Sequence, residues 1–163
     1  MTNQSDASPR DGEFRHRTSC EVRFRDLDAF GHVNNAVFST YAELARIRYL
    51  LDVLQPDRPF ERMPLILAHL AIDFRSPIQL GEALVVETRV TDVGRSSIGM
   101  RHRMTADRRV VAELETVLVT YDYAAARSMP VPDAWRQRLV AHEGRALDRQ
   151  PADARPVPAG SST

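Results

Sequence analysis

Hydrophobic and polar positions change their spacing in a defined order along the chain. Residues 20–25 alternate, with Cys20, Val22 and Phe24 on one side and charged residues on the other. This period of two is typical of a half-buried strand. A turn that contains Gly31 follows directly. The first predicted element is therefore a strand over residues 20–25 that leads into a turn.

A long helical pattern comes next, over residues 35–54. Apolar side chains cover most of its circumference, and only a narrow strip stays polar, formed by Ser39, Glu43, Arg46 and at its margin Arg48. Asn34 is a favourable residue for the helix N-cap, and Pro56 requires the helix to end before it. A helix with so little polar surface is expected to be surrounded by other structure.

Four further strands are predicted after this helix, over residues 65–74, 84–93, 96–104 and 110–121. Their links are short, and residues 92–95 and 107–109 have the character of hairpin turns. A short terminal helix is expected over residues 132–142. A parallel sheet would need a helix after each strand. The order therefore predicts an α+β fold, in which an antiparallel sheet of about five strands wraps around one long central helix.

Composition narrows the classes of function. The 163 residues carry 22 basic and 22 acidic side chains, so the formal net charge is zero and no basic field for nucleic acid is expected. Every basic residue is arginine, which excludes a Schiff-base lysine and a phosphate-loop lysine. Cys20 is the single cysteine, so neither an internal disulfide nor a zinc cluster is expected. We expect no metal and no cofactor.

The two ends of the chain differ from its middle. Residues 1–17 have no apolar run, and residues 144–163 are rich in proline and poor in large apolar side chains. Both are predicted to be disordered, as an N-terminal arm and a tail, around one domain over residues 18–143. No stretch approaches the length needed to cross a bilayer or resembles a secretory signal. We expect a cytoplasmic protein with no membrane partner.

The segment over residues 22–35 carries the most unusual chemistry. It places Asp26, Asp28, Gly31, His32 and two asparagines directly before the predicted helix. Unpaired N–H groups and the helix dipole at that point favour developing negative charge. A nearby carboxylate can act as a nucleophile or as a general base toward water.

The segment contains the run Arg-Asp-x-Asp-x-x-Gly-His-Val-Asn-Asn, which is followed by Tyr41, Glu43 and Ala45-Arg46. This pattern resembles the hotdog-fold acyl-CoA thioesterases related to 4-hydroxybenzoyl-CoA thioesterase. The pieces Phe74-Arg75-Ser76-Pro77-Ile78 and Val93-Gly94-Arg95-Ser96-Ser97 agree with it. The resemblance covers roughly residues 18–140. It implies a hydrolase that cleaves an acyl-CoA thioester to the free acid and CoA. It also implies a homodimer, or a dimer of dimers, with the acyl site between subunits.

The resemblance also implies roles for particular residues. Asp28 matches the catalytic aspartate, as nucleophile or general base, and the backbone N–H of Asn35 matches the group that polarises the thioester carbonyl. Gly31 and His32, in the same turn, are predicted to bind the substrate. The depth of the acyl pocket would depend on Val37, Phe38 and Tyr41. Arg95, Ser96 and Ser97 have donors that could bind the CoA phosphates, or they form only a turn. Close relatives of the hydroxybenzoyl type carry an aromatic pair where this chain has Asn34-Asn35, so that substrate is not assumed.

Other interpretations of these residues stay open. Asp28 could simply form an Asx turn, His32 could be a structural turn residue or a base, and Glu43 could replace Asp28 or only pair with Arg46 on the helix surface. A metal site built from Asp26, Asp28 and His32 lacks a distant fourth ligand. At the level of function, the alternatives are a non-catalytic acyl-CoA-binding or regulatory module and an enoyl-thioester hydratase, although the turn lacks the Asn-Pro pair of that hydratase group.

Overall fold

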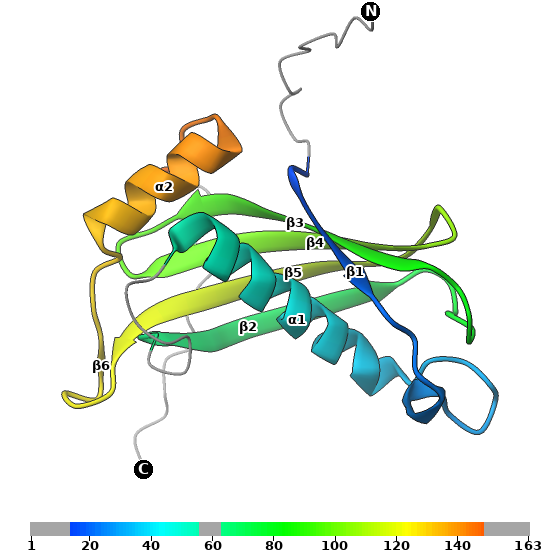
Figure 1. The fold of residues 1–163 in the computed structure, drawn as a ribbon. Coiled ribbons are helices and arrows are strands. Elements are labelled where there is room, and N and C mark those ends of the chain that lie inside the picture. The colour runs from blue at the N-terminus through cyan, green and yellow to red at the C-terminus, as the bar shows by residue number, and fades with distance from the viewer. Residues whose placement is uncertain (1–13, 56–62, 149–163) are drawn as a thin grey trace, which may run out of the picture.

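The computed structural model describes residues 14–55 and 63–148 (Figure 1). The strands are β1 (His16–Cys20), β2 (Leu65–Phe74), β3 (Leu84–Val93), β4 (Ser97–Ala106), β5 (Arg109–Asp122) and the short β6 (Arg127–Ser128). The helices are the 3-10 turn η1 (Phe24–Asp26), α1 (Asn35–Leu54) and α2 (Asp133–Glu143). The sheet has the order β1-β3-β4-β5-β2, and β6 pairs with the end of β5. The predicted architecture of a sheet around one long helix is confirmed.

Helix α1 lies along one face of the curved sheet, and α2 packs near its C-terminal end (Figure 1). The bounds of α1 are those predicted from the sequence. The side chain of Asn34 accepts a hydrogen bond from the N–H of Ala36 at 2.9 Å, which is the expected N-cap. At the other end Gln55 closes the helix in the left-handed conformation, with a φ of 44°.

The strand predicted over residues 20–25 is wrong in position. The strand covers His16–Cys20, and its last residue, Cys20, pairs with Leu84, the first residue of β3. Beyond Cys20 there is no strand left to pair with, so the chain turns away and forms η1. Phe24 is consequently 80% exposed, although Val22 is buried in the core. Residues 16–19 gave no signal because only polar side chains alternate there.

The remaining strands lie close to their predicted bounds, and β3, β4 and β5 join through tight hairpins. Asp107 and Arg108, between β4 and β5, both have positive φ values, of 46° and 67°. This is the geometry of a two-residue type I′ turn, whose twist matches that of the flanking strands. All pairs in the main sheet are antiparallel. The hairpins therefore fix the registers of β3, β4 and β5 against one another.

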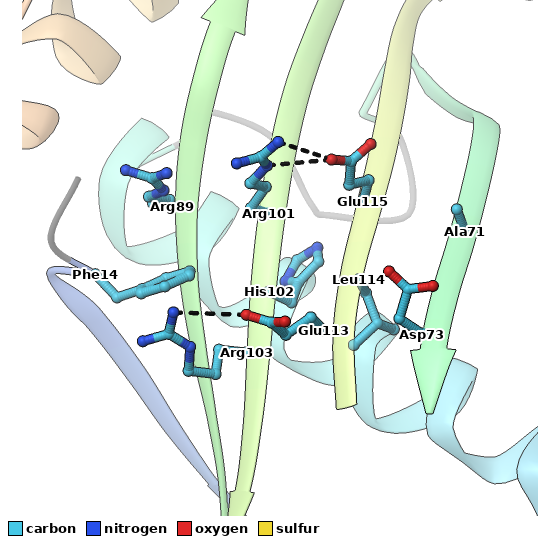
Figure 2. A pocket seen from close by; sticks show the side chains of 10 residues that line it. All are labelled: Phe14, Ala71, Asp73, Arg89, Arg101, His102, Arg103, Glu113, Leu114 and Glu115. Atoms are coloured by element: carbon cyan, nitrogen blue, oxygen red, sulfur yellow. Dashed lines mark hydrogen bonds and ion pairs between the residues drawn. The ribbon is translucent and has the colours of Figure 1, made fainter. Parts of the chain in front are cut away.

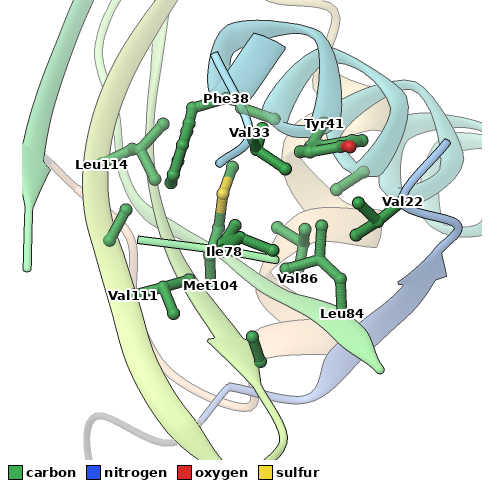
Figure 3. Packing of buried hydrophobic residues seen from close by; sticks show 14 residues of the cluster. Val22, Val33, Phe38, Tyr41, Ile78, Leu84, Val86, Met104, Val111 and Leu114 are labelled. Atoms are coloured by element: carbon green, nitrogen blue, oxygen red, sulfur yellow. The ribbon is translucent and has the colours of Figure 1, made fainter. Parts of the chain in front are cut away.

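The core between α1 and the sheet consists of two groups of buried side chains, one at each end of the helix. The group at the N-terminal end (Figure 3) includes Val33, Phe38, Tyr41, Ile78, Leu84, Met104 and Leu114. The group at the C-terminal end includes Tyr49, Leu50, Leu54, Ile98, Met100 and Leu139. These groups hold the two ends of α1 independently, so each end can carry a different polar arrangement.

One position of the predicted polar strip on α1 is buried. Arg46 is 8% exposed, so its expected place on a solvated helix surface beside Glu43 is wrong. Burial lowers the pKa of Arg46, and the charge of Glu43 acts against that shift. Beneath α1, His102 is held between the hydroxyls of Thr88 and Thr116 at 3.0 and 3.1 Å. Burial, together with the charge of Arg46, lowers the pKa of His102 to about 3, so this histidine is neutral and structural.

The predicted arm and tail lie mostly outside the described residues. Where they are described, they contact the fold: Arg17 belongs to β1, Arg15 donates to the carbonyl of His142 at 2.8 Å, and Leu147 is buried. The ordered structure thus extends a few residues beyond each predicted boundary. Across the described part of the chain, neither helix has the length and apolarity that a bilayer crossing requires.

Candidate active site

The turn between η1 and α1 is a small closed loop built by its own backbone. The N–H of Asp28 donates to the carbonyl of His32 at 2.7 Å, and the N–H of Gly31 donates to the carbonyl of Asp28 at 3.1 Å. Gly31 has a φ of +79°, which an L side chain rarely adopts. Leu27 and Val33 form a bridge at the neck of this loop. The sequence therefore specifies a loop that presents residues 28–32 in one fixed arrangement.

The carboxylate of Asp28 is half-buried and only partly engaged. Its Oδ1 accepts the N–H of Phe30 at 2.8 Å and the N–H of His32 at 3.3 Å, which is the Asx turn that the sequence left open. Within residues 14–55 and 63–148, no donor lies within hydrogen-bond distance of Oδ2. The turn thus orients the carboxylate through one oxygen and leaves the other for a water or a substrate carbon.

The first turn of α1 supplies a free backbone donor close to Asp28 in the sequence. The Asn34 side chain accepts from Ala36, and the Asn34 carbonyl accepts from Val37 at 2.8 Å. The N–H of Asn35, the first residue of the helix, has no acceptor in the described part of the chain. A backbone N–H at a helix N-terminus can stabilise a developing oxyanion. The side chain of Asn35 is exposed.

Asp26 differs from Asp28 because it is buried, with 4% of its surface exposed. It accepts hydrogen bonds from the Arg23 N–H and guanidinium and from the Tyr41 hydroxyl at 2.9 Å. Burial acts to raise the pKa of Asp26, but the bonds from Arg23 and Tyr41 outweigh it and hold that pKa below its ordinary value. Its carbonyl also accepts the N–H of Asn34 at 2.9 Å. Asp26 therefore ties η1 to α1 on both sides of the Asp28 loop.

The loop after β2, residues 75–83, lies against the Asp28 turn. His32 forms a backbone bridge with Gln79, and the N–H of Val33 donates to the carbonyl of Ile78 at 2.8 Å. Ile78 is fully buried. His32 itself is half-buried. The structure thus places Asp28, Gly31 and His32 in one hydrogen-bonded turn that precedes Asn35, and a loop from a distant part of the chain supports this turn.

The residues predicted to line an acyl pocket are largely packed within this chain. Phe38 is buried and stacks edge-on against Phe74, with ring centroids 5.1 Å apart. Tyr41 is buried, and its hydroxyl is engaged by Asp26. Val37 is half-buried against the same core group. All three belong to the first two turns of α1, which begin at the candidate oxyanion site, and they pack in the core group at that end of the helix.

The structure does not bring the other predicted residues to this site. The β3–β4 hairpin, at the end of the sheet opposite the Asp28 turn, contains Arg95, Ser96 and Ser97. The strands β3 and β4 between this hairpin and the Asp28 end of the sheet are roughly 30 Å long. Backbone groups of the hairpin are engaged there: Ser96 accepts from Thr120, and Arg95 accepts from Val131. Glu43 is exposed on α1. Within one chain, neither Glu43 nor this hairpin shares the arrangement around Asp28.

A separate cavity of about 480 Å³ lies on the face of the sheet that α1 does not cover (Figure 2). Its walls are cross-strand ion pairs, Arg101–Glu115 at 2.9 Å and Arg103–Glu113 at 3.5 Å. Phe14 lies over Arg103, with its ring centroid 5.1 Å from the guanidinium carbon. None of the residues predicted for the site lines this cavity. Because opposite charges on neighbouring strands stabilise a sheet by pairing with each other, this cavity is explained as part of a charge-paired sheet surface.

Two residues that support the site were not predicted from the sequence. Arg23 was assigned to a strand, and Arg109 was assigned only to a hairpin turn, yet both hold segments that support the Asp28 turn. The spacing between Arg23 and Asp26 is a local signal that could have been used. No local signal connects Arg109 to Glu82. In residues 14–55 and 63–148, no three His, Cys, Asp or Glu side chains are grouped as a metal site would need.

Comparison with known families gives one match that covers most of the chain. The model of a family described as the thioesterase-like superfamily matches residues 22–139. This span contains the Asp28 turn, α1, all strands after β1, and the first part of α2. The match therefore rests on the whole sheet-and-helix unit.

Comparison with individual proteins agrees with this match. A thioesterase from Thermus thermophilus, crystallised with coenzyme A and zinc, is 44% identical, with a TM-score of 0.72, over 80% of this chain and 96% of that one. The acyl-acyl carrier protein thioesterase ATL3 of Arabidopsis thaliana is 26% identical over 77% of this chain and 67% of its own length. A 1,4-dihydroxy-2-naphthoyl-CoA hydrolase of Synechococcus elongatus is 25% identical over 69% of this chain and 85% of its own length.

Proposed function

Because the chain belongs to the thioesterase-like superfamily and has its hotdog fold, it is a thioester hydrolase, and we propose that Asp28 is its reacting carboxylate. The substrate that its relatives support is an acyl-CoA thioester, cleaved to the free acid and CoA. The observation that carries the assignment of Asp28 is its geometry: one carboxylate oxygen is fixed by two N–H groups, and the other has no donor among the described residues, in the turn that precedes α1.

The reaction can be written with the groups present in this turn. The thioester carbonyl oxygen accepts the N–H of Asn35, and the helix dipole adds to the stabilisation of the developing oxyanion. Asp28 Oδ2 takes a proton from a water as that water attacks the carbonyl carbon. The carbon–sulfur bond then breaks, and CoA leaves as a thiolate that is protonated on release. In the alternative route Oδ2 attacks the carbon directly and water hydrolyses the resulting anhydride.

A second copy of the chain would complete this site. Phe30 is 85% exposed next to Asp28, and Leu67 and Phe74 are exposed on β2, whose outer edge has no partner strand in the described chain. Exposed apolar side chains at a strand edge favour association. The proposal therefore includes a homodimer in which the partner covers the turn. Analytical ultracentrifugation tests it: a monomer at micromolar concentration would contradict the dimer, and a tetramer would indicate paired dimers.

Thiol release from a panel of acyl-CoA substrates tests the role of Asp28. We expect Asp28→Asn to lower kcat by about 10²-fold or more, because the amide can neither accept the water's proton nor act as a nucleophile. The matched control is Asp133→Asn, an exposed aspartate in α2, which should leave the rate unchanged. A fully active Asp28→Asn enzyme would move the role to His32 or Glu43.

One further measurement can detect the anhydride route through Asp28. In a single turnover in ¹⁸O-labelled water, attack by an Asp28-activated water places the label in the released acid. The anhydride route with attack at the Asp28 carbon places it in the carboxylate of Asp28, where mass spectrometry of the peptide detects it. Label in Asp28 would establish the anhydride route, whereas label in the acid alone arises whenever water attacks the acyl carbon, in either route.

A further inference from the structure

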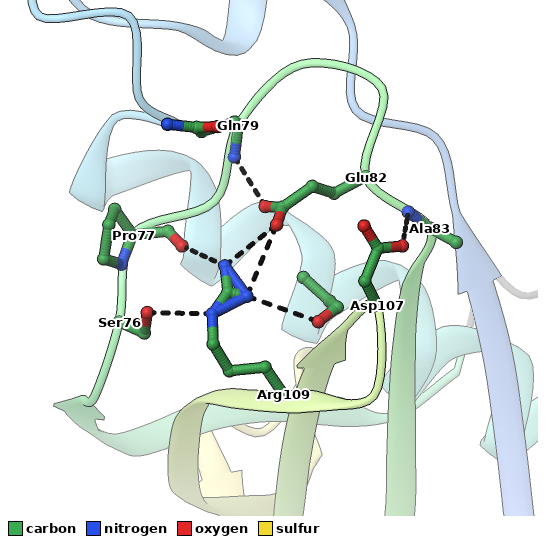
Figure 4. Close-up of polar contacts among 8 residues, drawn as sticks. Ser76, Pro77, Gln79, Glu82, Ala83, Asp107 and Arg109 are labelled. Carbon is green, nitrogen blue, oxygen red and sulfur yellow. Dashed lines mark hydrogen bonds and ion pairs between the residues drawn. The ribbon is translucent and has the colours of Figure 1, made fainter.

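Arg109, the first residue of β5, joins several segments that are distant in sequence (Figure 4). Its Nε donates to the Ser76 hydroxyl at 3.1 Å, and its Nη2 donates to the Pro77 carbonyl at 2.9 Å. Both terminal nitrogens approach Glu82 Oε1, at 3.3 and 2.9 Å. A contact from Nη1 to the Ala106 carbonyl at 3.4 Å completes the set. One guanidinium thus holds both ends of the loop over residues 76–82.

Glu82 passes this constraint to the middle of the loop. While Oε1 pairs with Arg109, Oε2 accepts the N–H of Gln79 at 2.7 Å. The neighbouring hairpin residue Asp107 holds the next position, because its carboxylate accepts the N–H of Ala83 at 3.1 Å and its own N–H donates to the Ala83 carbonyl at 3.2 Å. The β4–β5 hairpin therefore fixes the whole loop rather than one residue of it.

The loop in turn contacts the Asp28 turn at two adjacent backbone positions. Gln79 bridges His32, and the carbonyl of Ile78 accepts the N–H of Val33 at 2.8 Å. His32 is also the residue whose N–H donates to Asp28 Oδ1 and whose carbonyl accepts the N–H of Asp28. Two residues, Glu82 and Gln79, therefore link the Arg109 guanidinium to His32, whose N–H orients the Asp28 carboxylate.

We infer that Arg109 is a positioning residue for Asp28, acting through Glu82 and the loop over residues 76–82. The inference rests on the proposed function of Asp28. Arginine suits the role because its planar fork of five donors can satisfy a hydroxyl, a carbonyl and a carboxylate at once, which a lysine ammonium cannot do in a fixed geometry. A small displacement of a reacting group is costly to the chemical step but not to substrate binding.

Kinetics of Arg109→Gln give the first test, with Arg108→Gln as the matched control. Arg108 is the preceding residue, is exposed, and has the same charge. We expect Arg109→Gln to lower kcat about tenfold with KM changed less than twofold, because the turn is displaced while the binding surface is kept. Arg108→Gln should match the wild type. Equal kinetics of the two variants, or a rise in KM alone, would overturn the inference.

Amide hydrogen exchange gives a readout that needs no substrate. The N–H of Val33 reports the bond from the turn to the loop, at the Ile78 carbonyl, and the N–H of Asp28 reports the bond inside the turn, to the His32 carbonyl. We expect both to exchange faster in Arg109→Gln than in Arg108→Gln, while the amides of α1 from Ala42 to Leu50 keep their rates. A uniform change over the whole fold would indicate a general loss of stability and would contradict a positioning role.

Two further variants keep the inference testable if Arg109→Gln folds poorly. Glu82→Gln leaves Arg109 its bonds to Ser76 and Pro77 but weakens the relay to Gln79, so an intermediate loss of kcat is expected. Arg109→Lys should restore little activity, because the charge alone is insufficient.

Two outcomes distinguish failure of this inference from failure of the proposed function. If Asp28→Asn is fully active while Arg109→Gln still raises the exchange rate of the Val33 amide, the assignment of Asp28 fails and the link from Arg109 to the turn stands. If Asp28→Asn is inactive and Arg109→Gln changes neither kcat nor exchange, the inference about Arg109 fails alone.

Discussion

The two ends of α1 carry nearly the same polar contact. Near the N-terminal end the Tyr41 hydroxyl donates to buried Asp26 at 2.9 Å, and near the C-terminal end the Tyr49 hydroxyl donates to buried Glu143 at 2.6 Å. Each carboxylate also accepts one backbone N–H, from Arg23 or from Val90. Burial raises the pKa of both tyrosines. Each end of the helix is thus tied to the rest of the fold by a tyrosine and a carboxylate.

The ends differ in what lies beside that contact. At the C-terminal end α2 covers Tyr49, and His16 and His142 pack edge-on against its ring, at 5.3 and 5.4 Å between centroids. At the N-terminal end a second carboxylate, Asp28, stands half-buried with one oxygen unengaged. A buried carboxylate that accepts from a tyrosine hydroxyl and a backbone N–H holds structure together, whereas the half-buried carboxylate of Asp28, bound only by N–H groups of its own turn, is accessible for chemistry. Burial and hydrogen bonding, rather than residue type, separate the two roles.

The largest expected effect that would test this comparison comes from removing the two buried carboxylates. Glu143→Ala leaves the Tyr49 hydroxyl and the Val90 N–H buried without an acceptor, which should lower the free energy of unfolding by about 3 kcal/mol. The effect on kcat should stay within about twofold, because the active end is intact. Urea unfolding and thiol release measure the two quantities.

Asp26→Ala is the matched change at the other end. It should lower the free energy of unfolding by a similar amount, about 3 kcal/mol. Here, however, kcat should also fall, by about tenfold, because Asp26 holds both sides of the Asp28 turn. If Glu143→Ala lowered kcat as much as Asp26→Ala does, the two ends would not be functionally separate.

Acidification should loosen the two ends in different pH ranges. Burial lowers the pKa of His142 below 6.5, so its neutral form contributes stability above that value and this stability is lost as the pH falls below it. The pKa of Asp26 is held below 3.8, so its contribution persists until the pH falls below that value. Between about pH 6 and 4, α2 should therefore loosen before the Asp28 turn does.

Hydrogen exchange at several pH values, corrected for intrinsic rates, measures this order. His102, whose pKa is lowered to about 3, weakens the whole fold over the same range, so the quantity to follow is the ratio of exchange in α2 to exchange in the turn. The charges that face His142 are those of Glu143, His16 and Arg15. His142→Leu should remove most of the pH dependence of this ratio. Simultaneous loosening of both regions would contradict the expected order.

Much of the fold was predictable because each segment contained its own signal. The bounds of α1 followed from Asn34 and Pro56, and β2 and β3 from alternation and short links. The exception was β1, where alternating polar residues give no apolar period. Its position depends on where β3 begins, and that is a tertiary property.

The site was predictable only where it is local in sequence. Asp28, Gly31, His32 and Asn35 lie within eight residues, so the spacing itself brought them together. The partners that orient them, Tyr41 on Asp26 and Arg109 on Glu82, depend on how helices and loops pack. For Arg95–Ser97 the sequence left binding of the CoA phosphates and a simple turn both open, and the sheet places this hairpin at the end opposite the Asp28 turn. The dimer, the tetramer and the cytoplasmic location stay predictions.

The smallest expected effect, and the finest test of the comparison, is the loss of a single hydroxyl at each end. Tyr49→Phe and Tyr41→Phe remove one hydrogen bond each, so both should lower the free energy of unfolding by about 1 kcal/mol. Only Tyr41→Phe should lower kcat, by about threefold, because the Asp26 carboxylate then keeps Arg23 but loses its contact with Tyr41 on α1, and the Asn35 N–H shifts relative to Asp28. The two variants match in residue type and in stability, so a difference in kcat cannot come from general loosening. Equal kcat values would show that the Asp28 turn keeps its geometry without the tie to Tyr41, and Arg23 would then be the partner of Asp26 that matters for catalysis.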